Sequence, residues 1–121
     1  MPPIIVVEPE QVLFQIATKD FSFVAEEHIS IIFDHVVSHR IKVNMMRNTA
    51  VSFLVCVKNE PDKLEALSAD LERLFHVSTT EGLELFTIRH ADEKTLDELR
   101  KGKKILLEED FGSTHQMVIQ I

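Results

Sequence analysis

One order of segments constrains the fold of this chain most: strand, helix, strand, strand, helix and strand, within residues 11–81. Residues 11–18 alternate apolar and polar side chains, which is the period of a strand. Asp20 and Ser22 then offer N-cap groups, and apolar residues at helical spacing predict a helix that runs to about His39. The first half of the order is therefore a strand followed by a helix.

The second half of the order starts with a pair of strands. Residues 41–47 and 50–57 return to the strand period, and the short turn between them predicts an antiparallel hairpin. Pro61 suits the first turn of a helix, where its missing N–H is not needed. Residues 75–78 form the last strand, which we expect to end at Glu81-Gly82. The buried stripe of the second helix is predicted to be Leu64, Leu67, Leu71 and Leu74.

The rest of the chain begins a second set of segments. Leu83 to Arg89 has the strand period, and Asp92 offers a cap for a short helix. Residues 105–107 and 116–121 predict two more strands. No second helix follows, and the apolar run Ile4–Val7 is available to complete this second sheet.

The βαββαβ order is typical of the ferredoxin-like fold, in which two helices cover one face of an antiparallel sheet. The right-handed crossover rule leaves few other ways to pack these segments. We therefore predict an α+β chain with one complete unit over residues 10–81. Residues 1–9 together with 82–121 are predicted to form an abbreviated second unit, into which the complete unit is inserted.

Charge and composition exclude several classes of function. The net charge of −7 is the opposite of the basic face that a nucleic-acid-binding protein presents. The basic cluster from Arg100 to Lys104 is typical of a helix C-terminus, with Gly102 as its cap. The 3 glycines form no phosphate-binding loop, and no apolar run is long enough to cross a bilayer. We therefore expect no nucleic-acid partner and no membrane partner.

No set of residues reaches the level of an active site. His35 and His39 lie one helical turn apart and could hold zinc, but His28 is too far along the helix to bind the same ion. The pair Glu26-Glu27 is more typical of a solvated face than of converging catalytic carboxylates. The single cysteine, Cys56, lies among apolar residues, which indicates a buried thiol and a reducing cytoplasm. We expect no catalytic residue, no metal site and no cofactor in this chain.

The stretch from His39 to Phe53 resembles a hairpin of the regulatory region of aspartate kinases. In that family a helix ends before an "I-x-V" strand, and a turn of small polar residues leads into a "VSF" strand, as in Ile41-Lys42-Val43 and Val51-Ser52-Phe53. Glu81-Gly82-Leu83 resembles the junction between the two ACT units of the family. The similarity covers residues 11–89 and continues more weakly to the end. The family's nested pair of ACT units agrees with the segment order.

The resemblance implies a regulatory function. Aspartate kinases phosphorylate the side-chain carboxylate of aspartate with ATP, and their ACT units bind an end-product amino acid that inhibits the kinase. The kinase domain would lie N-terminal to this region, and ATP and magnesium would belong to that domain. The resemblance therefore implies a cytoplasmic chain with lysine or threonine as effector, and a homodimer formed through the ACT units.

The resemblance places the effector between the loop after the first strand, residues 18–27, and residues 42–44 of a partner unit. Backbone N–H groups at the start of a helix independently suit a carboxylate, and Asn44 suits an ammonium group. Glu26 or Glu27 could meet a cationic side chain. Asn44 also fits an alternative role, as a strand residue bonded to the backbone. The candidate effector-binding residues are Ser22, Phe23, Val24, Ala25, Glu27, Lys42, Val43, Asn44, Asn48 and Thr49.

One departure from the family keeps an alternative open. Effector loops of the family often carry a glycine before the first helix, whereas residues 24–28 contain none. The alternative is an ACT-type dimerisation module without a bound effector. No sequence motif supports a third possibility, that the chain is an enzyme in its own right.

Overall fold

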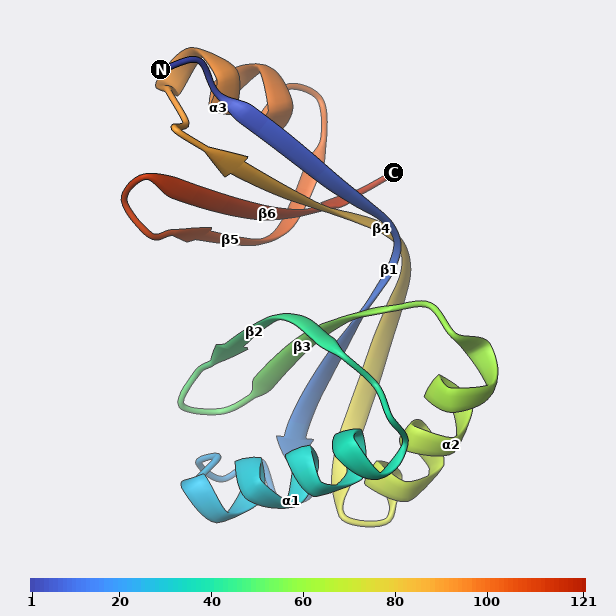
Figure 1. The fold of residues 1–121 in the computed structure, drawn as a ribbon. Coiled ribbons are helices and arrows are strands. Elements are labelled where there is room, and N and C mark those ends of the chain that lie inside the picture. The colour runs from blue at the N-terminus through green and yellow to red at the C-terminus, as the bar shows by residue number, and fades with distance from the viewer. The chain divides into compact units, whose positions relative to one another are not determined.

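The computed structural model describes residues 1–121 and contains six strands and three helices (Figure 1). None of the helices is long and apolar enough to span a membrane. In chain order the elements are β1 (Ile4–Thr18), α1 (Glu26–Ser38), β2 (Val43–Asn48), β3 (Phe53–Lys58), α2 (Pro61–Glu72), β4 (Phe75–Arg89), α3 (Glu93–Arg100), β5 (Lys104–Asp110) and β6 (Thr114–Gln120).

The strands follow the sheet order β2-β3-β1-β4-β6-β5, and the predicted α+β, ferredoxin-like ACT fold is confirmed. The chain divides into two compact units. We call Val12–Glu81 the two-helix unit, because it contains α1 and α2. We call Met1–Gln11 together with Gly82–Ile121 the one-helix unit, because it contains only α3.

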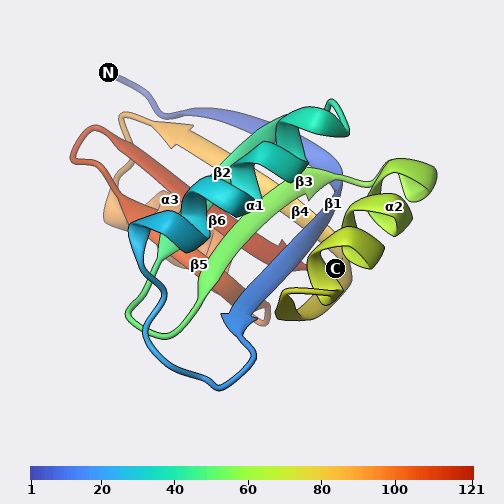
Figure 2. The same ribbon diagram turned by 90° about the horizontal axis from the view of Figure 1, so that it is seen from below.

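In the two-helix unit, α1 and α2 lie side by side over one face of the sheet (Figure 2). The helices and strands bury apolar side chains against each other because both are apolar on the face that they share. Leu64, Leu67 and Leu71 of α2 are buried as predicted, whereas Leu74 lies beyond the end of the helix and is half exposed. The buried cluster is Val12, Phe14, Ile16, Ile32, Val36, Ile41, Phe53, Val55, Val57, Leu64, Leu67, Leu71 and Phe75.

The predicted hairpin of β2 and β3 is present and antiparallel, with Met46 opposite Val55 and Asn48 opposite Phe53. Its register shifts between Val43 and Met45, so that Asn44 lies at a β-bulge. The strands start later than predicted, at Val43 and Phe53. A bulge at the start of an edge strand is a common way to end pairing there.

In the one-helix unit, α3 packs on β4 and β6 through a cluster of Phe86, Ile88, Leu96, Met117 and Ile119. Asp92 caps α3 as predicted, since its carboxylate accepts a hydrogen bond of 2.8 Å from the Thr95 N–H. Gly102 follows the helix with a φ of 69°, which is the left-handed conformation predicted for it.

An ionic cluster joins α3 to β5 and β6 in the one-helix unit. The Glu108 carboxylate accepts a hydrogen bond of 2.5 Å from Arg100 and lies 2.6 Å from Nε2 of His115. The His115 side chain is buried, whereas those of Arg100 and Glu108 are about one-third exposed or less. The bond from Arg100, more than that from His115, holds the pKa of the Glu108 carboxyl below its ordinary value.

Two predicted strand ends are wrong. The runs at 4–7 and 11–18 are one strand, β1, and the runs at 75–78 and 83–89 are one strand, β4. Each long strand instead passes through a left-handed residue, Glu10 with a φ of 55° in β1 and Gly82 with a φ of 72° in β4. Glu81-Gly82, which was expected to end a strand, therefore lies inside β4, since one left-handed residue can be inserted as a bulge without ending a strand.

The predicted start of the first helix is also wrong. The helix begins at Glu26, with Ala25 as its N-cap, and Asp20 and Ser22 belong to the loop before it. The predicted end near His39 is confirmed, because His39 is the C-cap. The physical reason is that the side chains of Asp20 and Ser22 form hydrogen bonds within the loop and not with the helix N–H groups.

Candidate functional site

The loop between β1 and α1 is held by its own polar side chains. The hydroxyl of Thr18, which is buried, lies 3.1 Å from the Asp20 carboxylate and 3.0 Å from the Ser22 carbonyl oxygen. The Ser22 N–H donates to the Asp20 carboxylate over 3.1 Å. Hydrogen bonds from Ser22 and Thr18 hold the pKa of the Asp20 carboxyl below its ordinary value. The carboxylate is therefore charged and engaged in the turn, not available as a helix cap.

Phe21 is an exposed residue of this loop. Its φ of 59° is left-handed, a conformation that is uncommon outside glycine. The ring stacks on His76 of β4, with centroids 4.7 Å apart and planes inclined by 11°. The neighbouring Phe23 is 75% exposed. Two exposed aromatic side chains thus lie in the predicted effector loop. Phe23 was among the candidate residues, whereas Phe21 was missed.

The start of α1 has no side-chain cap for its first N–H groups, because Ala25 is the N-cap. The Ala25 N–H itself donates to Nδ1 of His28 over 2.8 Å, and the His28 N–H donates back to the Ala25 carbonyl over 3.0 Å. Uncapped N–H groups at a helix start can bind an anion such as a carboxylate. Glu26 and Glu27, both exposed in the first turn, add negative charge at the rim of this end.

The loop is tied to the tip of the β2–β3 hairpin. The Val24 N–H donates to the Ala50 carbonyl over 2.9 Å. In the hairpin turn the Thr49 hydroxyl donates to the Ser52 carbonyl over 3.0 Å and accepts from the Ser52 N–H over 3.0 Å. The Thr49 side chain is therefore used within the turn. Asn48, at the end of β2, is exposed beside it.

The structure brings together only part of the predicted site. Ser22, Phe23, Val24, Ala25 and Glu27 lie in the loop and at the start of α1, and the Val24 bond to the hairpin places Asn48 and Thr49 at the same end of the unit. Lys42, Val43 and Asn44 lie at the other end of β2. At about 3.3 Å per residue the two ends of this strand are roughly 15 Å apart. Within one copy of the chain, the ten candidate effector-binding residues therefore do not form a single site.

A groove of about 400 Å³ lies elsewhere in the two-helix unit, between α2 and the neighbouring strands. None of the candidate residues lines it. Its polar lining includes the carboxylates of Glu65, Glu72 and Glu81, and Ser68 donates to Glu72 over 3.2 Å. Three carboxylates repel the carboxylate of a free amino acid, so this groove is the poorer place for such a ligand.

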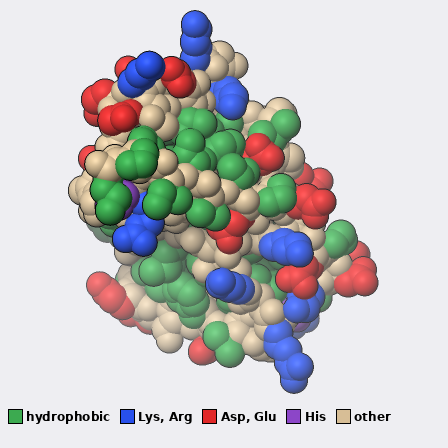
Figure 3. Space-filling view, turned by 45° about the horizontal axis from the view of Figure 1, so that its top comes forward, with side chains coloured by type: hydrophobic (Ala, Val, Ile, Leu, Met, Phe, Trp, Pro, Cys, Tyr) green, Lys and Arg blue, Asp and Glu red, His purple; other side chains and the backbone are tan.

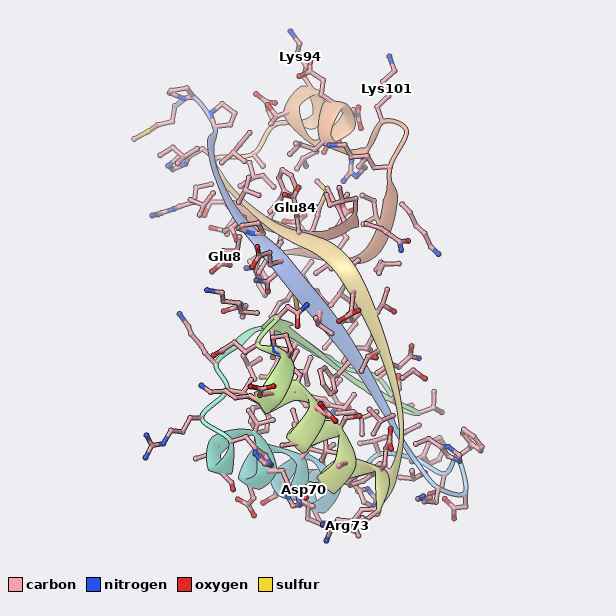
Figure 4. All side chains as sticks on the ribbon, turned by 90° about the vertical axis from the view of Figure 1, so that its right-hand side faces the viewer. Glu8, Asp70, Arg73, Glu84, Lys94 and Lys101 are labelled. Atoms are coloured by element: carbon pink, nitrogen blue, oxygen red, sulfur yellow. The ribbon has the colours of Figure 1, made fainter.

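No group of three or more His, Cys, Asp or Glu side chains in the structure is placed to hold a metal ion. His39 instead bonds to Asp70 of α2, with 2.7 Å between Nε2 and the carboxylate, and Nδ1 of His35 lies 3.8 Å from the same oxygen. Figure 4 shows Asp70 of α2 near Arg73, the C-cap of that helix, and the two side chains form an ion pair of 3.3 Å. The His39 bond holds the pKa of the Asp70 carboxyl below its ordinary value. These histidines therefore link α1 to α2.

The two units, a complete βαββαβ fold and a second fold with one helix, have the arrangement of the ACT-like, ferredoxin-type fold. No protein-family model matches the chain, and no curated protein sequence matches it. Several solved structures match its fold, and those compared below are regions of aspartate kinases.

A domain from Porphyromonas gingivalis, described as a C-terminal regulatory domain of aspartate kinase, matches with a TM-score of 0.80 and 10% identity, over 98% of this chain and 86% of that one. Escherichia coli aspartokinase III, in complex with lysine and aspartate, matches with a TM-score of 0.71 and 17% identity, over 97% of this chain and 28% of that one. The regulatory subunit of aspartate kinase from Thermus thermophilus, free of ligand, matches with a TM-score of 0.66 and 13% identity, over 96% and 86%.

The fold is thus that of aspartate kinase regulatory domains. The chain spans under a third of the length of the Escherichia coli enzyme and most of the length of the separate regulatory domains. The TM-scores show a shared fold, and identities of 10–17% are too low to show a shared ligand or activity.

Proposed function

We propose that the chain is the amino-acid-sensing regulatory domain of an aspartate kinase, and that it mediates end-product feedback inhibition and dimerisation. The observation that carries this proposal is the match over 98% of the chain to a regulatory domain of that enzyme. The Escherichia coli structure supports an amino acid as the effector, because lysine is bound to that protein. The kinase domain would be a separate part of the parent protein, and it would hold ATP and magnesium.

The loop side of the site would bind the effector carboxylate. The first N–H groups of α1 have no side-chain cap, and the helix dipole adds positive charge at that end. No buried side-chain nitrogen or oxygen in the structure lacks a hydrogen-bond partner. A ligand would therefore bind to backbone groups at the surface of the loop, without displacing a buried interaction.

The other half of the site would come from a second copy. Residues 42–44 and Asn48 lie at opposite ends of β2, which is the outer strand of its sheet. If two copies approach antiparallel along β2, residues 42–44 of one copy come close to Asn48 of the other. The effector ammonium would then face Asn44 of the partner. Binding and dimerisation would be coupled for this geometrical reason.

The effector would be lysine or threonine. Glu26 and Glu27 are both exposed at the start of α1. A lysine side chain would gain an attractive contact with these carboxylates, whereas threonine would gain only hydrogen bonds. The acidic rim thus favours the cationic effector.

Thermal unfolding with each of the twenty amino acids tests this proposal. A ligand at 100 times its Kd stabilises the folded state by about 2.7 kcal/mol, which corresponds to roughly 10 °C in Tm for a domain of this size. We expect lysine to give the largest rise. The variant Asn44→Ala should lose most of the rise, and the matched variant Asn59→Ala should keep it. A chain whose Tm ignores all twenty amino acids would be the dimerisation module without effector.

A further inference from the structure

A histidine caps the start of α1, in the place where other helices use glutamate or glutamine. Ala25 is the N-cap, and His28 is the third residue of the helix. In the common capping box, a Glu or Gln side chain at this third position accepts a hydrogen bond from the N-cap N–H. Here Nδ1 of His28 accepts that bond from the Ala25 N–H over 2.8 Å. The helix start is therefore held by the type of side chain that changes its charge between pH 5 and 8.

This capping bond requires one protonation state of the His28 ring. A backbone N–H only donates, so Nδ1 carries a free electron pair and the ring proton lies on Nε2. A proton taken from solvent would bind to Nδ1 and turn the acceptor into a donor, so that two N–H groups would face each other. The helix dipole also disfavours a positive imidazolium at a helix N-terminus. The bond is therefore available only to neutral His28.

The first two residues of β4 contact both His28 and the loop before it. The ring of His28 meets that of Phe75 edge to face, with centroids 6.1 Å apart and planes inclined by 85°. Phe75 belongs to the buried cluster of the two-helix unit, whereas His28 is partly exposed and open to solvent protons. The next residue, His76, stacks on Phe21 of the loop. The same strand thus supports the capping ring and the loop that the cap connects to the helix.

We propose that His28 is a positioning residue of the amino-acid site and that it makes effector affinity depend on pH. The first N–H groups of α1, which would bind the effector carboxylate, follow directly after Ala25. The bond to His28 holds Ala25 in an extended conformation, with φ of −98° and ψ of 171°, and so fixes how the loop enters the helix. Without the bond the first turn frays, and its N–H groups no longer point together at one carboxylate.

The sign of the pH dependence follows from the neutral form of the cap. Above the range in which histidine titrates, His28 accepts from Ala25 and the loop is ready to bind. Below this range the protonated ring releases the Ala25 N–H, and only a fraction of the molecules keeps the binding conformation. Apparent affinity falls in proportion to that fraction. Effector binding should therefore weaken as the pH falls from 8 to 6.

Other titratable groups lie on the elements around the start of α1. Glu26 and Glu27 lie in its first turn, and Asp20 lies in the loop before it. Carboxyl groups titrate at lower pH than imidazoles. His76 of β4 is the second imidazole at this end of the unit, and its contact with the loop is a ring stack without a hydrogen bond to the helix start. His28 is therefore the one imidazole here whose protonation removes a helix cap.

Charged groups elsewhere also respond to pH, so the experiment needs a matched variant. Asp70 of α2 lies 2.7 Å from His39 and 3.8 Å from His35, toward the other end of α1. Figure 3 shows acidic and basic side chains spread over the face that it draws. The chain has 6 histidines, and a change of pH alone does not identify the one that matters. A variant that keeps the cap but does not titrate in this range does identify it.

Calorimetric titration of the full chain with lysine at pH 8 and pH 6 tests the proposal. Wild type should bind roughly fivefold more weakly at pH 6, which is the typical effect of losing a helix cap. His28→Gln keeps an acceptor for the Ala25 N–H at both pH values and should bind equally at both. His28→Ala should bind weakly at both. The control His90→Gln removes an imidazole of the one-helix unit and should keep the pH dependence of wild type. Equal pH dependence in wild type and H28Q, or tighter binding at pH 6, would overturn the proposal.

Nitrogen NMR of the imidazole rings supplies a measurement that needs no ligand. In the free chain at pH 8 we expect a proton on Nε2 of His28 and none on Nδ1, and the Ala25 amide signal should shift as His28 takes up a proton. A proton on Nδ1 at pH 8, or an Ala25 signal that ignores the titration of His28, would overturn the proposal.

The inference rests on the proposed function for its effector, and the two fail differently. A chain that shows the expected NMR signals but binds no amino acid contradicts the proposed sensing and leaves His28 as a cap of the helix alone. A chain that binds lysine with the same pH dependence in wild type and H28Q contradicts only the role of His28.

Discussion

The two-helix unit and the one-helix unit share one strand arrangement but differ in what covers their sheets. In the two-helix unit α1 and α2 lie over the strands, and the buried cluster is entirely apolar. In the one-helix unit a single short helix covers a small cluster, and the Arg100–Glu108–His115 cluster adds polar contacts between α3, β5 and β6. The comparison shows how coverage changes along one strand: β1 is exposed over Ile4–Val7 in the one-helix unit, whereas Val12, Phe14 and Ile16 are buried in the two-helix unit.

The largest effect should come from the apolar cores. Leu71→Ala removes a fully buried side chain from the cluster of the two-helix unit and should lower the free energy of unfolding by about 3–5 kcal/mol. Leu96→Ala in the one-helix unit should cost about 2–3 kcal/mol, because a small cluster under one helix can collapse more easily. Urea unfolding measures both. Equal losses would show that the two cores are packed equally tightly.

A smaller effect should come from the ionic cluster. Glu108→Gln removes the charge that meets Arg100 and His115 and should lower the free energy of unfolding by about 2 kcal/mol near neutral pH. Because folding lowers the pKa of Glu108, its contribution is present above the ordinary glutamate pKa of about 4.3 and is lost as the pH falls through the lower folded value. The difference in free energy of unfolding between wild type and E108Q should therefore become smaller in acid. A gap that is constant from neutral pH down to acid unfolding would contradict this assignment.

The smallest effect should come from the residues that follow the helices. Gly102 after α3 and Arg40 after α1 both have positive φ, 69° and 55°. Gly102→Ala should lower the free energy of unfolding by about 1 kcal/mol, and Arg40→Gly should raise it by roughly 0.5–1 kcal/mol, because only glycine adopts this conformation without strain. Thermal unfolding checks both predictions: Gly102→Ala should lower Tm, and Arg40→Gly should raise it. Two shifts of the same sign would show that side-chain contacts, not backbone conformation, decide the outcome.

The order of the elements could be predicted because it rests on strong periodicity. Leu64, Leu67 and Leu71 repeat at helical spacing, and the strands of the hairpin alternate clearly. The ends of β1 and β4 were not predictable in this way. Glycine and proline usually mark an end, but Gly82 and the residues around Pro9 sit inside strands that continue on either side.

The candidate site could be predicted only in part. Asp20 and Ser22 look like helix caps in sequence, yet the buried Thr18 hydroxyl draws both into a turn. The spacing Thr-x-Asp-x-Ser, which suits side-chain-to-backbone turns, was the available signal. His28 as the acceptor for the Ala25 N–H had no such signal, because histidine is not among the preferred capping residues.

The single thiol of Cys56 has a consequence for how the protein ages in solution. Cys56 is fully buried in β3, so air cannot oxidise it in the closed molecule. A disulfide between two chains therefore forms only from molecules that have opened. The rate at which a disulfide-linked dimer accumulates during storage without reductant therefore reports how often the region around Cys56 opens to solvent.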